Sequence, residues 1–132
     1  MNIFVLHHDP VIAARMASYR HSIKMILESA QMLCTVAHDF GVPAPYKPSF
    51  RNHPCTRWVA ESKQNWVWLQ TYALALCREY THRYGKTHKS ETVIAELPVP
   101  PLPNKGLTPF AQAMPEQYQD RDAVKAYRQY YA

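Results

Sequence analysis

Two long stretches with helical periodicity constrain the fold of this chain more than any other feature of its sequence. They cover residues 11–40 and 53–84, and each is followed directly by a glycine, Gly41 or Gly85. Glycine adopts the left-handed backbone that often closes a helix, so both glycines mark helix ends. Residues 42–53 contain three prolines and no periodicity. They therefore predict a loop between two long helices.

Shorter elements flank these helices. Residues 2–6 read as a short strand or an extended arm, and Asp9-Pro10 reads as an N-cap followed by proline in the first helical turn. Bends are expected near Ser18 and near residues 62–64. Further along lie a short helix over 90–97, a stiff connector over 98–103 (PVPPLP), a turn near 110–114, and a last helix capped by Asp120 or Asp122 and ending at Tyr131. We predict an all-α fold, a compact bundle of two long and two or three short helices with proline-rich loops.

Length and composition suit one domain over residues 1–132, because 47% of the residues are hydrophobic and can form a core without disulfides or a structural metal. Cys34, Cys55 and Cys77 are an odd number without CxxC spacing, which favours buried free thiols. No apolar run approaches the ~20 residues that span a membrane. The first residues lack the features of a signal peptide. A cytoplasmic protein that does not enter the membrane is the expectation.

The charge balance favours an anionic partner. Fifteen Lys and Arg residues against ten Asp and Glu residues give a net charge of +5 and an isoelectric point near 9.2. This moderate excess indicates DNA or a nucleotide as the ligand more than an acidic protein.

A polar stripe on the first long helix is the foremost candidate site. His21, Lys24 and Glu28 follow one another at steps of three and four, so they lie on one face. A base, a cation and a carboxylate in one line suit general acid–base catalysis, and Arg20 beside them adds positive charge for a phosphate. The alternative is a solvated helix face. The stripe continues through Gln31, Thr35 and His38, opposite a predicted buried face formed by Ile23, Ile26, Leu27, Ala30, Leu33, Cys34 and Ala37.

Two basic segments are candidate phosphate sites. Arg51, Asn52, His53 and Arg57 surround the start of the second long helix, where free backbone amides favour anions. Ordinary helix capping by Asn52 or His53 is the alternative, and Cys55 in this turn could serve as a nucleophile. Lys86, His88 and Lys89 lie in a basic loop whose letters GKT do not form a P-loop, because a helix and not a strand precedes them.

Trp68 and Tyr72 fall beside the main apolar face of the second long helix. They are candidates for stacking on a nucleic-acid base, with packing in the core as the alternative. His7, His8 and Asp9 have no recognised metal-ligand spacing with other residues, so neither a metal nor another cofactor is predicted.

Several stretches resemble a group of small tailed-phage proteins, and a shorter one resembles the phage pyrimidine-dimer DNA glycosylases of the endonuclease V type. The first likeness rests on HSIKMILESAQMLC (21–34), NHPCTRWVAES (52–62), YGKTHKS (84–90), residues 106–118 and AVKAYRQYY (123–131). The second rests on MASYRH (16–21) and the aromatic tail YRQYYA (127–132). It implies a compact all-α fold and a DNA-holding role for Arg20, but His21 stands where that family has its catalytic glutamate.

That family also uses the amine of a small residue exposed by removal of the initiator methionine. Here this residue would be Asn2, which disfavours such removal. The likeness therefore implies DNA binding more firmly than it implies the family's lyase chemistry.

Three functional hypotheses follow. The first is a phage DNA-acting protein, similar to a DNA glycosylase, in which His21 and Glu28 share proton transfer. The second is a non-catalytic protein that sequesters a nucleotide or cyclic dinucleotide from a host defence pathway, with a pocket of the kind that a homo-oligomer often frames. The third is an interaction protein of the virion or replication complex that uses residues 98–103 as a docking strip.

Overall fold

The computed structural model describes the backbone of residues 2–17 and 19–131 and the side chains of residues 2–17 and 23–131. Across these residues the chain forms six α-helices, one turn of 3₁₀-helix and no strand, which confirms the predicted all-α class. The helices are α1 (Pro10–Met16), α2 (Tyr19–Asp39), α3 (Pro54–Glu61), α4 (Lys63–Tyr84), α5 (Glu91–Glu96) and α6 (Ala123–Tyr131), with the 3₁₀ turn η1 at Glu116–Tyr118. Four helices are short, one more than the largest number predicted.

Local capping explains most helix boundaries. The Asp9 carboxylate accepts hydrogen bonds from two amides of the first turn of α1, at 2.8 and 3.2 Å, and Pro10 opens the helix. Ser62 ends α3, and its hydroxyl then accepts the Asn65 amide at 3.1 Å, so α4 begins at once. Gly85 closes α4 with a φ of 67°. The break predicted near Ser62 is confirmed, and the one near Ser18 lies between α1 and α2, although Ser18 itself is outside the described residues.

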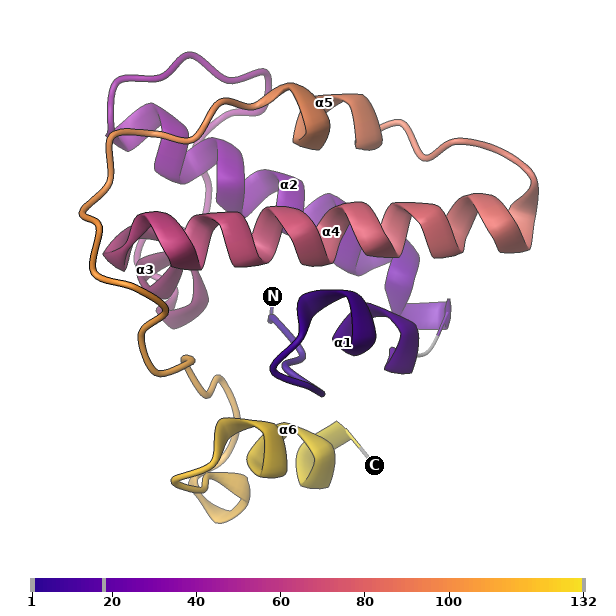
Figure 1. Cartoon of the computed structure of the whole chain (residues 1–132), viewed down its shortest axis with the longest axis vertical. Coiled ribbons are helices and arrows are strands. Elements are labelled where there is room, and N and C mark those ends of the chain that lie inside the picture. Colours follow the sequence, from indigo (N-terminus) through magenta and orange to yellow (C-terminus); the bar gives the residue numbers. More distant parts are fainter. Residues whose placement is uncertain (1, 18, 132) are drawn as a thin grey trace.

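Helix α4 forms the centre of the molecule. In Figure 1 it crosses the middle of the view, with α2 behind it, α1 below it and α5 above it, and it packs against α1, α2, α3 and α5. Because neighbours cover more than one side, α4 is buried well beyond a single apolar stripe. Its buried side chains include Trp66, Trp68, Leu69, Tyr72, Ala73, Leu76 and Cys77.

The polar stripe of α2 faces protein along much of its length, which differs from a solvated helix face. Glu28 and Thr35 are buried, whereas Ile23, predicted for the buried face, is 43% exposed. The loop over residues 42–53 covers the C-terminal half of the polar stripe. The Ser49 amide donates to Thr35 Oγ1 at 3.0 Å, and His38 Nε2 lies 3.0 Å from the Tyr46 carbonyl oxygen. The three cysteines are buried and free, as predicted.

The two ends of the described chain meet. Residues 2–6, the N-terminal arm, are extended and largely buried, and α6 packs on them below the bundle. The Phe4 ring contacts the Tyr127 and Tyr131 rings with centroids 6.2 and 5.1 Å apart, and Arg128 Nε donates to the Leu6 carbonyl at 2.9 Å. Asp122 caps α6, as one of the two predicted candidates.

The proline-rich connector lies along α4 and is not a free strip. Pro100 and Leu102 are buried, and the Lys63 amide donates to the Pro103 carbonyl at 2.8 Å. In place of the turn expected near residues 110–114, residues 110–113 have no regular structure, a bend lies at Met114, and the 3₁₀ turn follows at Glu116–Tyr118. Among the described residues, no helix combines the length and apolar character needed to cross a bilayer.

Candidate active site

One cavity brings together segments that are distant in the sequence, and we call it the N-terminal cavity. It has a volume of about 440 Å³. The N-terminal arm, α2, the start of α3, the extended segment before η1 and α6 all contribute to its walls. The lining residues are Asn2, Phe4, Lys24, Met25, His53, Ala113 and Tyr130.

Lys24 lines this cavity and forms an ion pair with Glu28, one helical turn further along α2. Lys24 Nζ lies 3.7 Å from Glu28 Oε2, and the Lys24 side chain is 72% exposed while that of Glu28 is 10% exposed. The lysine therefore projects into the cavity above a carboxylate that is almost covered by protein. A carboxylate in this setting can accept a proton or stabilise a positive charge that develops on a sugar.

Cys55 lies in the first turn of α3. Its side chain is fully buried, and burial raises the pKa of its thiol to about 11, with the negative charge of Glu28 making a smaller contribution to the increase. The same result corrects the idea that Cys55 is a nucleophile, because a buried thiol with a raised pKa is not a thiolate at neutral pH.

Asn2 fixes the wall formed by the N-terminal arm. Its Nδ2 donates to the Ala113 carbonyl at 2.8 Å, and its Oδ1 accepts the Ile3 amide at 2.8 Å. The Tyr127 hydroxyl lies 3.0 Å from the same Oδ1 and 2.7 Å from the Ala111 carbonyl, so its single proton can go to either acceptor. Burial raises the pKa of Tyr127, which keeps the hydroxyl protonated. This network holds the arm against α6 and shapes the cavity.

The predicted phosphate ligands near α3 separate into different environments. His53 lines the cavity and caps α3, because its Nδ1 accepts the Cys55 amide at 3.1 Å. Arg57 is exposed and follows His53 by one helical turn, so it lies on the same face of α3. Asn52 is exposed as well. Arg51 instead binds Asp39, with Nε 2.8 Å from both carboxylate oxygens, so an anion at Arg51 would compete with this ion pair.

The predicted phosphate ligands in the loop after α4 also differ in their exposure to solvent. Lys86 and Lys89 are exposed, whereas His88 is buried and its Nδ1 accepts the Ser90 amide at 3.0 Å. Burial lowers the pKa of His88, so it is neutral near pH 7. The phosphate-binding role predicted for His88 is therefore corrected to a structural one, in which it contacts the Tyr80 ring and the backbone of Ile23 in α2.

Trp68 and Tyr72 belong to the core. Tyr72 is 1% exposed and Trp68 is 6% exposed, and their rings stack on each other with centroids 5.4 Å apart. Trp68 Nε1 donates to the His8 carbonyl at 2.8 Å, which fixes its ring under the N-terminal segment. Their ring faces are covered by protein, which corrects the stacking role in favour of the alternative.

Arg20 and His21 lie in the first turns of α2 by their backbone. Their side chains are outside the described residues, as is Met1. The helical spacing of residue 21 from Lys24 and Glu28 remains the basis of the role predicted for His21.

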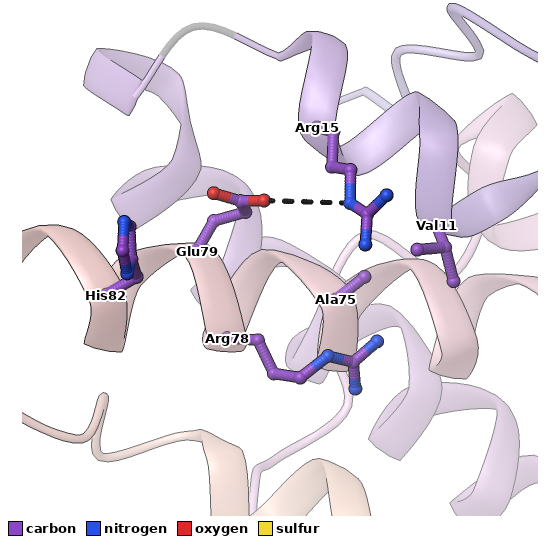
Figure 2. Close-up of a pocket in the computed structure, with 6 residues that line it drawn as sticks. All are labelled: Val11, Arg15, Ala75, Arg78, Glu79 and His82. Atoms are coloured by element: carbon purple, nitrogen blue, oxygen red, sulfur yellow. Dashed lines mark ion pairs between the residues drawn. The ribbon is translucent and has the colours of Figure 1, made fainter.

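A second concavity, the α1–α4 groove, has a volume of about 390 Å³ and is shown in Figure 2. Arg15 of α1 faces Glu79 of α4 across it, with Nε 4.0 Å from Oε1. Arg78 and His82 add further basic groups from α4. Val11 and Ala75 complete the apolar part of its lining. The sequence analysis did not identify this groove as a site.

The sequence also missed Tyr130 and Met25 as parts of the N-terminal cavity. The aromatic tail pointed to Tyr130 only through its likeness to a family. Across the part of the chain that the structure describes, no group of three or more His, Cys, Asp or Glu side chains is arranged to hold a metal ion.

The structure is that of a small basic all-α protein in which Lys24, a residue of the N-terminal cavity, is paired with Glu28. Residues 1–92 match the sequence model of a family described as pyrimidine dimer DNA glycosylase, and the chain belongs to this family. The match includes the N-terminal arm, Lys24, Glu28 and His53, but ends before α6. Comparisons with curated proteins and with solved structures find no match.

Proposed function

We propose that this protein is a DNA N-glycosylase that binds a damaged or modified pyrimidine nucleotide at the N-terminal cavity and cleaves its glycosidic bond. The observation that carries the proposal is the pairing of Lys24, which lines that cavity, with the almost covered carboxylate of Glu28, in a chain of the pyrimidine dimer DNA glycosylase family.

The described residues suggest a division of roles. Lys24 is an exposed cation that lines the cavity, and Arg57 is an exposed cation beside it, one helical turn after His53. Both therefore suit the phosphates on either side of the target nucleotide. Arg20, Asn52, Lys86 and Lys89 extend this basic surface in the proposal. Glu28 stabilises the positive charge that develops on the deoxyribose, and with His21 it handles the proton lost by the attacking nucleophile.

The nucleophile separates two versions of the reaction. A water molecule that attacks C1′ releases the base and leaves an abasic site. An α-amine that attacks C1′ displaces the base, which leaves with a proton, and loses one N–H proton to give an aminal. Opening of the C1′–O4′ bond, with protonation of O4′, then gives an imine that links the protein to the sugar. If Met1 is removed, Asn2 carries this amine, and Asn2 lines the cavity. The likeness to the family supports the amine, and Asn2 as the second residue supports water.

The test is a labelled duplex that contains a single pyrimidine dimer, followed by duplexes with other modified pyrimidines. Base release, detected by alkaline cleavage at the resulting abasic site, is the expected result. Borohydride in the reaction traps the protein on DNA only if an imine forms. If the wild type and its His21 and Glu28 variants release bases at the same rate on every such substrate, catalysis at this cavity is refuted.

A small nucleotide is the second candidate ligand, and the α1–α4 groove favours it. Arg15, Arg78 and His82 surround an apolar lining, which suits an anionic and partly apolar molecule. A sequestering protein should gain thermal stability from one nucleotide or cyclic dinucleotide and little from DNA. The third hypothesis is docking through residues 98–103. The burial of Pro100 and Leu102 against the bundle weighs against it, whereas the exposure of the other four residues of this segment leaves them accessible to a partner.

A further inference from the structure

His88 is a buried residue in a loop whose neighbouring positions are exposed. Its side chain is 7% exposed, whereas the residues directly before and after it are exposed. The ring packs edge-on against the Tyr80 ring of α4, with centroids 5.0 Å apart. The nitrogens of a covered histidine ring need hydrogen-bond partners inside the protein. Both nitrogens of His88 have such partners, in two different parts of the fold.

The two bonds define where the ring carries its proton. Nδ1 accepts the Ser90 amide at 3.0 Å, so this nitrogen has no proton. The proton of the neutral ring is therefore on Nε2. The ring also bonds to the backbone of Ile23, and the acceptor there is the carbonyl oxygen. His88 thus joins the loop before α5 to the first turns of α2.

The loop side of this connection is itself held in place. Ser90 is fully buried, and its hydroxyl lies 2.8 Å from the Tyr46 hydroxyl. The Tyr46 carbonyl oxygen in turn lies 3.0 Å from Nε2 of His38, near the end of α2. His88 therefore projects from a braced segment, so its bond to Ile23 restrains α2 more than it restrains the loop.

The bond to Ile23 acts one peptide group away from Lys24. A peptide group is planar and includes the Cα atom of the following residue, so the Ile23 carbonyl and the Lys24 Cα atom lie in one rigid plane. Lys24 lines the N-terminal cavity and lies 3.7 Å from Glu28. Among the described side chains of α2, the first buried one is Met25. His88 therefore attaches α2 to the fold ahead of the part that core packing holds.

We propose that His88 is a positioning residue of the N-terminal cavity, which fixes the first turns of α2 and thereby places Lys24 and residues 20 and 21. The proposal rests on the proposed function for the reaction that this placement serves. His88 acts through α2 and has no contact with the reacting bond. Displacement of a reacting group by about 1 Å can lower a rate on the order of 10²-fold, so a hydrogen bond that fixes the start of this helix affects the rate.

Two substitutions separate the two bonds of His88. His88→Asn keeps an oxygen near the position of Nδ1, where it accepts the Ser90 amide, but its side chain is too short to reach Ile23. His88→Gln places an amide nitrogen near the position of Nε2, where it donates to Ile23. Ser90→Ala is the control for the stability of the loop, because it removes the bond to the Tyr46 hydroxyl and keeps the amide that His88 accepts.

Hydrogen exchange measures the restraint on α2 without turnover. The amides of residues 23–27 bond to carbonyls in the first turns of this helix. We expect these amides to exchange about fivefold faster in His88→Asn than in the wild type, and at the wild-type rate in His88→Gln and Ser90→Ala. The amides of residues 33–37 should not change. Wild-type exchange in His88→Asn overturns the proposal, as does exchange in His88→Gln or Ser90→Ala that is as fast as in His88→Asn.

Base release from a pyrimidine-dimer duplex gives the second readout, measured in a single turnover at saturating DNA. His88→Asn should lower the rate by about tenfold, whereas His88→Gln and Ser90→Ala should keep the wild-type rate even where their melting temperatures fall. Equal rates in all three variants would show that His88 only stabilises the fold, which overturns the proposal. A wild type that releases no base refutes the proposed glycosylase, and the exchange pattern then still decides whether His88 positions α2.

Discussion

The N-terminal cavity and the α1–α4 groove are similar in size, at about 440 and 390 Å³, but they are built differently. The groove comes from two helices and contains an ion pair whose arginine side chain is 69% exposed. The cavity comes from segments more than a hundred residues apart, joined by the buried network around Asn2. Exposed ion pairs contribute little stability and rearrange easily, whereas buried hydrogen bonds hold a geometry. This difference supports the proposal that catalysis takes place at the cavity and adaptable binding at the groove.

The largest effect should come from a change at Glu28, the carboxylate paired with Lys24. Glu28→Gln should lower the rate of base release by about 10²–10⁴-fold, the usual contribution of a general acid or base. The control is Glu79→Gln in the groove, which should leave the rate unchanged. Single-turnover excision of a pyrimidine dimer measures both. An active Glu28→Gln protein with a normal melting temperature would remove the distinction between the two sites.

The next effect concerns stability. Asn2→Ala should lower the free energy of unfolding by about 2–4 kcal/mol, because several buried groups lose a hydrogen-bond partner. Arg15→Gln should change it by less than about 1 kcal/mol, because its ion pair with Glu79 is solvent-exposed. Urea denaturation followed by circular dichroism compares them. Equal losses would show that the groove is as firmly built as the cavity.

DNA affinity gives a smaller contrast. Arg57→Gln should weaken binding across all sequences and lower the slope of log affinity against log salt by about one, the signature of one lost phosphate contact. Arg78→Gln in the groove should leave the slope unchanged if DNA follows the cavity. Fluorescence anisotropy at several salt concentrations measures it. The reverse result would place the DNA along α1 and α4.

The smallest effect concerns acid stability and contrasts a buried with an exposed histidine. Because the pKa of His88 is lowered by burial, the unfolded chain takes up its proton first as pH falls. Stability is therefore complete above the unfolded pKa of about 6.5 and declines below it until the folded pKa is reached. This residue adds at most about 1.4 kcal/mol per pH unit to the slope.

His88→Gln should flatten that decline between pH 7.5 and pH 5, as measured by unfolding at each pH. His82→Gln in the groove, where the side chain is exposed, is the control and should leave the slope intact. If both variants give the wild-type profile, another group causes the acid dependence.

The sequence predicted what local interactions determine. Asp9, Ser62, Gly85 and Asp122 set helix boundaries through bonds to their own neighbours or through their own backbone preference, so both long helical stretches and their breaks could be read from the sequence. The pairing of Lys24 with Glu28 was predictable for the same reason, since helical spacing alone brings them together.

The sequence could not give what distant contacts determine. Trp68 and Tyr72 look exposed on a helical wheel, but α4 has neighbours on several sides and both rings are buried. His88 is surrounded by basic residues in the sequence, yet it packs inward against Tyr80. The association of α6 with the N-terminal arm joins Tyr127 to Asn2 across nearly the entire chain, and no local pattern reports such a contact.

The joining of residue 2 to residue 127 also sets the order in which the protein becomes competent during synthesis. The ribosome makes α1 to α5 well before α6, so the core can form on a nascent chain whose cavity still lacks a wall. A product that stops after α5 would be a folded protein without a working site. Because Val124 and Tyr127 of α6 also belong to the core, packing of the core and closure of the cavity are both completed only when this last helix has been made.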